Sequence, residues 1–121
     1  MKTLHDSKAV NTLNALIENT AQNGLITNTA VESLKSIRPH TISEEIPLLA
    51  EATRLAFEHI DEYGTFAIPI PDEEALEGEE AMVVESDANE SFHYFLCLIR
   101  DVDKKANEDE LREYVAALNA Y

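Results

Sequence analysis

Apolar residues recur every three or four positions over much of the chain, and this spacing predicts helices. The first helix is expected over residues 7–23. Its apolar positions are Val10, Leu13, Ile17 and Ala21. Asp6 or Ser7 can cap its start, because a short polar side chain accepts a hydrogen bond from a free backbone N–H group. Gly24 is expected to end it, since glycine adopts the left-handed conformation without steric cost.

The second helix is expected over residues 28–38. Thr29 and Glu32 have the spacing of a capping box, in which each side chain accepts a hydrogen bond from the other's backbone N–H group. Pro39 is expected to end this helix, because the residue before a proline is disfavoured in helical geometry.

Two further helices show the same apolar spacing. One is expected to start near Ser43–Glu45, with Pro47 in its first turn and Gly64 at its end. Its broad apolar face holds Leu48, Leu49, Ala52, Leu55, Ala56, His59, Ile60 and Tyr63. The last helix is expected to start with Asn107 as its cap. Its apolar face holds Leu111, Tyr114, Val115, Leu118 and Tyr121.

Between these helices the pattern changes. Residues 66–70 alternate between apolar and other positions, but prolines within and after the stretch restrict it to an edge strand or an extended arm. Residues 81–85 and 92–99 are short apolar runs typical of strands. The chain is therefore expected to form one α+β domain over residues 1–121. It would have three N-terminal helices, a small antiparallel sheet (about 66–70, 81–85 and 92–99) and a C-terminal helix.

A mostly α fold is the alternative, with residues 92–104 helical. The apolar residues Phe92, Phe95, Leu96 and Ile99 also fit helical spacing. Periodicity does not distinguish a strand from a buried helix over so short a run.

The chain has 121 residues and a single cysteine, Cys97, so it can form no internal disulfide. No apolar run is long enough to span a bilayer, and the first residues lack the apolar core of a signal peptide. These features predict a soluble protein of the reducing cytoplasm.

Negative charge dominates the composition, with nine Lys and Arg residues against 24 Asp and Glu residues, a formal net charge of −15. No basic residue lies between Arg54 and Arg100. The acids in that interval form the expected partner-binding face: Glu58, Asp61, Glu62, Asp72, Glu73, Glu74, Glu77, Glu79, Glu80, Glu85, Asp87 and Glu90. This charge argues against direct binding to nucleic acid or an anionic membrane, and it favours a protein partner with a basic surface.

The sequence contains no recognisable catalytic, metal or cofactor site. Its three glycines cannot build a phosphate-binding loop. Cys97 lies in an apolar run with His93 four positions earlier, but a zinc site needs three or four ligands. His59 and Glu62 have ligand spacing, but a di-iron site needs such a motif twice. We therefore expect a protein that is not an enzyme, and a small hydrolase with paired carboxylates is the least favoured reading.

Two functional hypotheses follow. In the first, the protein is an inhibitor or adaptor that occupies a basic surface of its partner. It would act as a nucleic-acid mimic, in the manner of phage or mobile-element inhibitors of a defence protein that binds DNA or RNA. In the alternative, it is an immunity-type, antitoxin-type or assembly module, a monomer or small homo-oligomer, that binds through the aromatic anchors Phe57, Phe66 and Tyr121.

Overall fold

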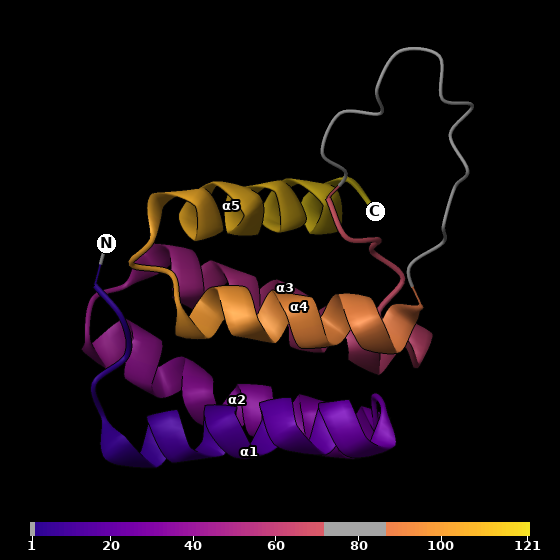
Figure 1. Cartoon of the computed structure of the whole chain (residues 1–121), viewed down its shortest axis with the longest axis horizontal. Helices are drawn as coiled ribbons and strands as arrows, with labels where there is room; N and C mark the ends of the chain where they lie inside the picture. Colours follow the sequence, from indigo (N-terminus) through magenta and orange to yellow (C-terminus); the bar gives the residue numbers. More distant parts are fainter. Residues whose placement is uncertain (1, 72–86) are drawn as a thin grey trace.

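The computed structural model describes residues 2–71 and 87–121, and it consists of helices joined by short connections (Figure 1). The helices are α1 (Ser7–Asn23), α2 (Thr27–Ser43), α3 (Pro47–Tyr63), α4 (Ala88–Arg100) and α5 (Lys105–Ala120). These two ranges contain no strand. The predicted α+β class is therefore wrong, and the alternative of a mostly helical domain is confirmed.

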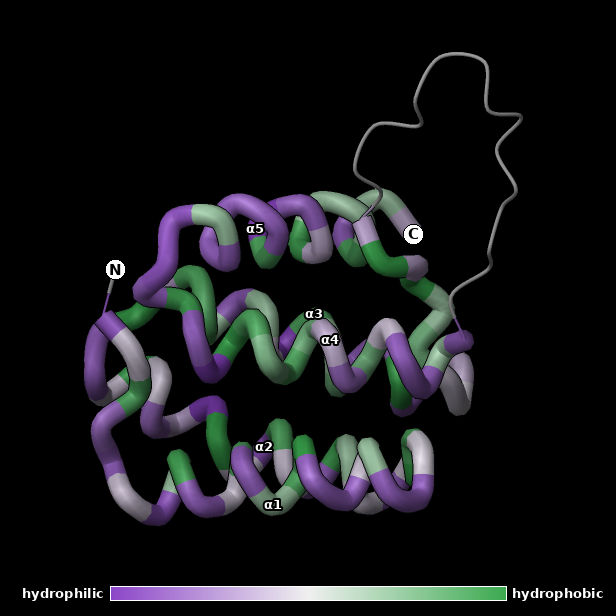
Figure 2. Tube along the Cα trace, in the orientation of Figure 1, coloured by the Kyte–Doolittle hydropathy of each residue, from purple (hydrophilic) through white to green (hydrophobic). Residues whose placement is uncertain are grey.

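The five helices form a closed ring around one core. Successive helices run in opposite directions, and α1 packs on α2, α2 on α3, α3 on α5, α5 on α4, and α4 on α1 (Figure 1). Apolar and polar positions alternate along every helix in Figure 2, because each helix turns one face to the core and another to solvent. None of the helices in the described ranges is long and apolar enough to cross a lipid bilayer.

The ends of α1 agree with the sequence prediction. The carboxylate of Asp6 accepts a hydrogen bond from the Ala9 N–H group at 2.9 Å, so Asp6 caps the first turn. Gly24 follows the last turn with a φ of 75°, in the region that favours glycine. The predicted range of residues 7–23 is confirmed.

The predicted limits of α2 are wrong at both ends. The helix begins at Thr27, and no side chain caps it, so Thr29 and Glu32 lie within the helix. At the other end it continues through Pro39 to Ser43. Pro39 removes one backbone donor, but Thr41 is fully buried beyond it and its hydroxyl donates to the Arg38 carbonyl at 2.6 Å. Tertiary burial of this last turn therefore outweighs the local preference against a helix before proline.

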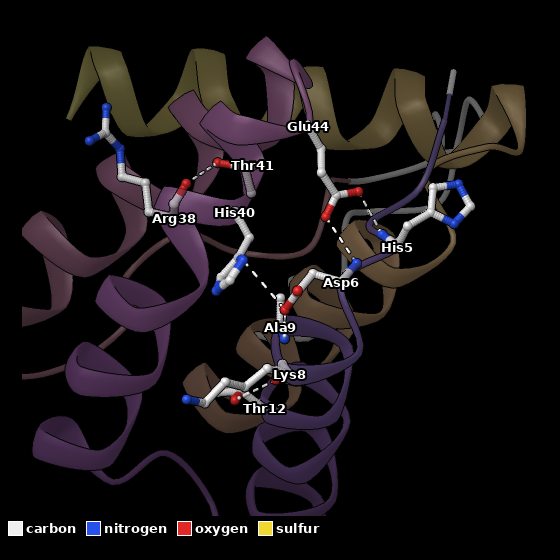
Figure 3. A network of polar contacts seen from close by, with 9 residues as sticks. All are labelled: His5, Asp6, Lys8, Ala9, Thr12, Arg38, His40, Thr41 and Glu44. Atoms are coloured by element: carbon white, nitrogen blue, oxygen red, sulfur yellow. Dashed lines mark hydrogen bonds and ion pairs between the residues drawn. The ribbon is translucent and has the colours of Figure 1, made fainter.

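The segment between α2 and α3 does not begin α3 as predicted. Ser43 ends α2, and α3 starts only at Pro47. The Glu44 carboxylate instead accepts hydrogen bonds from the backbone N–H groups of His5, at 2.7 Å, and Asp6, at 3.0 Å (Figure 3). It thus holds the chain that leads into α1. Gly64 ends α3 in the left-handed conformation, as predicted.

Residues 92–99 lie inside α4 and not in a strand. The residues at helical spacing, Phe92, Phe95, Leu96 and Ile99, are all buried. Asp87 caps the helix start by accepting a hydrogen bond from the Asn89 N–H group. The helix ends at Arg100 and not at residue 104, because residues 101–104 form a turn. The predicted strand over 81–85 lies outside the described residues.

The start of α5 also differs from the prediction. The helix begins at Lys105, with Lys104 at the cap position. Asn107 lies within the first turn, and its amide donates to the Asp101 carbonyl at 3.0 Å. The predicted apolar face is buried at Leu111, Tyr114, Val115 and Leu118, whereas Tyr121 is exposed.

Residues 64–71 form the extended arm that was the alternative to an edge strand, and this arm leaves the end of α3 and crosses toward the end of α5 (Figure 1). Phe66 and Ile68 point into the core and are buried. The Ser91 hydroxyl donates to the Ile68 carbonyl at 2.6 Å, and the Ala67 N–H group donates to Nε2 of His59 at 3.0 Å. The arm is thus fixed to both α4 and α3.

Candidate functional site

The net negative charge of the described residues is concentrated at one end of the bundle. We call this the acidic end: residues 17–33, 57–71, 87–94 and 114–121, where α1, α3 and α5 finish and α2 and α4 begin. It contains seven carboxylates and no Lys or Arg. The carboxylates are Glu18, Glu32, Glu58, Asp61, Glu62, Asp87 and Glu90. The rest of the described chain, the opposite end, has ten carboxylates and nine basic residues and is therefore almost neutral.

The two ends also differ in how their carboxylates are paired. At the opposite end, ion pairs join Arg100 to Asp101 at 2.9 Å and Arg112 to Glu108 at 3.1 Å. At the acidic end, Glu58 pairs with Arg54 at 3.1 Å. No ion pair within the described ranges involves the other six carboxylates, and all seven side chains are exposed. The acidic end therefore presents negative charge that its own described residues leave largely uncompensated.

Three aromatic rings meet at this end, and we call them the aromatic platform: His59, Tyr63 and Tyr121. The ring centroids are 4.8 Å apart for His59 and Tyr63, 4.7 Å for His59 and Tyr121, and 4.9 Å for the two tyrosines. His59 is only 6% exposed, whereas Tyr63 is 47% and Tyr121 60% exposed. The platform is thus a buried imidazole covered by two accessible phenol rings.

The fold brings these rings together from distant parts of the chain. His59 and Tyr63 are one turn apart on α3 and share a face. Helix α5 packs against α3, and Tyr121 follows the end of α5. Phe66, from the arm, lies against His59 with a centroid distance of 6.0 Å. The buried Phe66 therefore packs the platform against the hydrophobic core.

The His59 ring is held in one orientation. Its Nε2 accepts the Ala67 N–H hydrogen bond, so in the neutral ring Nδ1 carries the proton. Burial lowers the pKa of His59, and the nearby carboxylate of Glu62 opposes that shift. The same effect shows that the negative charge of Glu62 lies close to the platform.

The predicted acidic face is only partly within the described ranges. Glu58, Asp61 and Glu62 lie on α3, and Asp87 and Glu90 lie at the start of α4, all at the acidic end. Asp72, Glu73, Glu74, Glu77, Glu79, Glu80 and Glu85 lie outside the described residues. The sequence interpretation missed Glu18 and Glu32, which reach the same end from α1 and α2.

The three proposed aromatic anchors have different surroundings. Phe57 packs against the core, and Nζ of Lys35 lies 5.5 Å from its ring centroid. Phe66 is 1% exposed and contacts Phe92, Phe95 and Tyr114, so it supports the fold and offers no surface to a partner. Tyr121 is exposed. The sequence interpretation assigned Tyr63 to the buried face of its helix, but the structure exposes it beside Tyr121.

Two further pairs of polar side chains lie in or beside the core of the described residues. Sγ of Cys97 lies 4.0 Å from Nδ1 of His93 on α4, and burial raises the pKa of the thiol, which disfavours the reactive thiolate. The hydroxyls of Ser91 and Tyr114 are 2.9 Å apart in the core, and burial strongly raises the pKa of Tyr114. Within residues 2–71 and 87–121, no group of three or more His, Cys, Asp or Glu side chains could hold a metal ion.

Comparison of the chain with protein-family models, with curated proteins and with solved structures finds no match. The function is therefore inferred from the acidic end and its aromatic platform.

Proposed function

We propose that the protein is an inhibitor or adaptor that docks its acidic end onto a basic surface of another protein. The observation that supports this proposal most directly is the separation of charge along the bundle. Seven exposed carboxylates and no basic residue lie at the acidic end, while the opposite end of the described chain is almost neutral. We place the protein in the reducing cytoplasm as part of this proposal, because its only cysteine is a free thiol.

The physical basis is electrostatic complementarity. A surface of one charge sign steers a partner of the opposite sign and raises the association rate. Carboxylates then accept charge-assisted hydrogen bonds from arginine and lysine side chains. Proteins that bind nucleic acids carry basic surfaces suited to dense negative charge. A nucleic-acid-binding protein is therefore the partner class that we favour, with the acidic end acting as a mimic of the phosphate backbone.

The second candidate is a protein-binding module anchored by aromatic residues. The exposed pair Tyr63 and Tyr121 favours it, because tyrosines are enriched among the residues that dominate interface energies. In this candidate the carboxylates mainly steer the encounter. The two candidates differ in salt dependence, since a phosphate mimic loses affinity steeply as salt screens its charges.

The test is affinity capture with the full chain. Immobilised protein is exposed to cell lysate, and retained proteins are eluted with a salt gradient, with and without excess duplex DNA. A nucleic-acid-binding protein that elutes at moderate salt and is displaced by DNA would support mimicry. A partner that resists salt and ignores DNA would support the anchored module.

A matched pair of variants tests whether the acidic end is the surface used. One variant carries Asp61→Asn, Glu62→Gln and Glu90→Gln at the acidic end. The control carries Asp103→Asn, Glu51→Gln and Glu113→Gln at the opposite end, where these carboxylates are also exposed. Both variants change the net charge equally. The acidic-end variant should lose the partner while the control retains it, and equal losses would contradict the proposal.

A further inference from the structure

We propose that the acidic end recognises arginine in its partner, with the guanidinium group stacked on the ring of Tyr63 or Tyr121 and hydrogen-bonded to Glu62. This inference rests on the proposed function and specifies the chemistry of the partner segment. Three observations support it: the packing of the platform, the absence of an internal cation on the exposed rings, and the nearby carboxylate.

The packing of the platform determines the shape of ligand it can take. All three centroid distances lie between 4.7 and 4.9 Å, so the rings touch one another. An aromatic cage around an ammonium or methylammonium group needs a space between rings, and touching rings leave none. The planes of Tyr63 and Tyr121 are 74° apart, so a flat group can stack on only one of the two rings at a time. The guanidinium group of arginine is planar and stacks on aromatic faces, whereas the ammonium group of lysine is a compact, strongly hydrated charge.

The exposed rings lack a cation from the protein itself. Lys35 already occupies the ring of Phe57, with its Nζ 5.5 Å from the centroid. No Lys or Arg lies at the acidic end, and no cation of the described chain is placed over Tyr63 or Tyr121. The faces of these two rings are thus open to a cation from a partner.

The carboxylate and the support of the platform complete the site. The last turn of α3 carries the exposed carboxylates of Asp61 and Glu62 together with Tyr63, and the charge of Glu62 opposes the lowering of the His59 pKa. A carboxylate beside a ring can accept guanidinium N–H bonds while the ring contacts the guanidinium plane. His59 is fixed by the Ala67 N–H bond and by Phe66, so the platform is organised before a ligand arrives.

The test uses two labelled, end-blocked peptides of equal length and charge. In one, arginine alternates with glycine, and in the other lysine replaces each arginine. Binding of each peptide to the full-length protein is measured by fluorescence anisotropy at low ionic strength. The arginine peptide is expected to bind more tightly by about two- to fivefold for each ring engaged, the range measured for exposed cation–π contacts.

Variants identify the rings responsible. Tyr63→Leu and Tyr121→Leu keep apolar bulk and net charge but remove the aromatic faces, and together they should abolish the preference for arginine without weakening lysine binding. Phe57→Leu is the matched control, since Lys35 already occupies that ring, and it should keep the preference. Circular dichroism and thermal melting establish that each variant is folded before its binding is compared.

The outcomes separate this inference from the proposed function. If both peptides bind equally, or if the double tyrosine variant still prefers arginine, the inference is overturned while the binding of basic partners stands. If neither peptide binds even at low ionic strength, the proposed function fails as well. A preference for arginine that disappears only in the tyrosine variants supports both.

Discussion

Replacing Phe66 with alanine is expected to destabilise the protein strongly, although the residue lies in an arm outside the helices. Phe66 is 1% exposed, and its ring contacts three core rings: Phe92 at 5.4 Å, Phe95 at 5.2 Å and Tyr114 at 5.8 Å between centroids. Its removal leaves a hole among large side chains anchored on α4 and α5. Such side chains cannot easily move to fill it.

The expected cost follows from this environment. A buried Phe→Ala substitution costs about 3–5 kcal/mol, and the surrounding rings favour a value of about 4 kcal/mol. Domains are stable by only about 5–15 kcal/mol, so a large part of the stability would be lost. For a chain of this size we expect the melting temperature to fall by roughly 15 °C.

Urea unfolding followed by circular dichroism measures this change directly. The midpoint should fall while the slope of the free energy against urea stays constant, because the native state remains compact. Tyr121→Ala is the control, since its ring is mostly exposed, and it should change stability by less than about 1 kcal/mol. A loss below about 1 kcal/mol for Phe66→Ala would refute the placement of the arm in the core.

Three further predictions concern polar contacts. Burial lowers the pKa of His59 below its value in the unfolded chain. The contribution of His59 to the free energy of unfolding is therefore complete above about pH 6.5 and is lost as the pH falls through the folded pKa. The free energy of unfolding measured from pH 7 to 5 should decrease, and His59→Gln should make that decrease smaller. Glu44→Ala removes the acceptor for two backbone N–H groups that precede α1 and should cost about 1–2 kcal/mol, with faster amide hydrogen exchange at Asp6; unchanged exchange would contradict this role. Ser91→Ala removes the donor to the Ile68 carbonyl and should cost about 1–3 kcal/mol in urea unfolding, whereas a neutral effect would mean that water replaces the hydroxyl.

Local signals in the sequence predicted some elements well and failed where tertiary packing decided the result. Asp6 and Gly24 delimit α1 as expected, because side-chain capping and the freedom of glycine to adopt a positive φ are local effects. Pro39 misled the prediction, because burial of Thr41 extends the helix past it. Local sequence does not reveal which side chains a distant helix will cover.

The run at 92–99 shows a second limit. Its residues suit both a strand and a helix, since Leu98 is buried as well as Phe95 and Ile99. A strand at 92–99 would have needed a neighbouring strand with free backbone N–H groups. The arm was the predicted neighbour, and the prolines at positions 69 and 71 have no N–H group to donate. Giving more weight to the proline content of the arm would have favoured the helical alternative.

Part of the candidate site was also accessible from the sequence. Acidic residues on α3 and α4 were recognised from the interval without Lys or Arg, but Tyr63 was assigned to the core. Tyr63 belongs to the apolar stripe of α3, but it is the last residue of the helix, and it remains 47% exposed although His59 and Tyr121 contact its ring. Periodicity identifies a face of a helix but not how far along the helix that face is covered.

The alternating direction of the helices explains how the acidic end arises. Three stretches without Lys or Arg reach the acidic end, residues 9–34, 55–99 and 113–121, whereas a fourth, residues 39–53, lies at the opposite end. The first contains the turn between α1 and α2, the second contains the end of α3 and the start of α4, and the third contains the end of α5. Helices that run up and down place all of these segments at the same end. The gaps between basic residues therefore indicate the acidic end only once the directions of the helices are known, because the gap at 39–53 lies at the opposite end.

This distribution argues that the acidity serves more than solubility. Solubility depends on net charge and would be served as well by basic residues spread over both ends. Because all nine basic residues lie at the opposite end, the seven carboxylates of the acidic end repel one another, and this repulsion costs stability. The opposite end carries ten carboxylates as well, but there nine basic residues compensate them. A surface that retains repulsion at one end and neutralises it at the other is consistent with the proposed recognition of a basic partner. The exposed Tyr63 and Tyr121 lie on the end where that repulsion is retained.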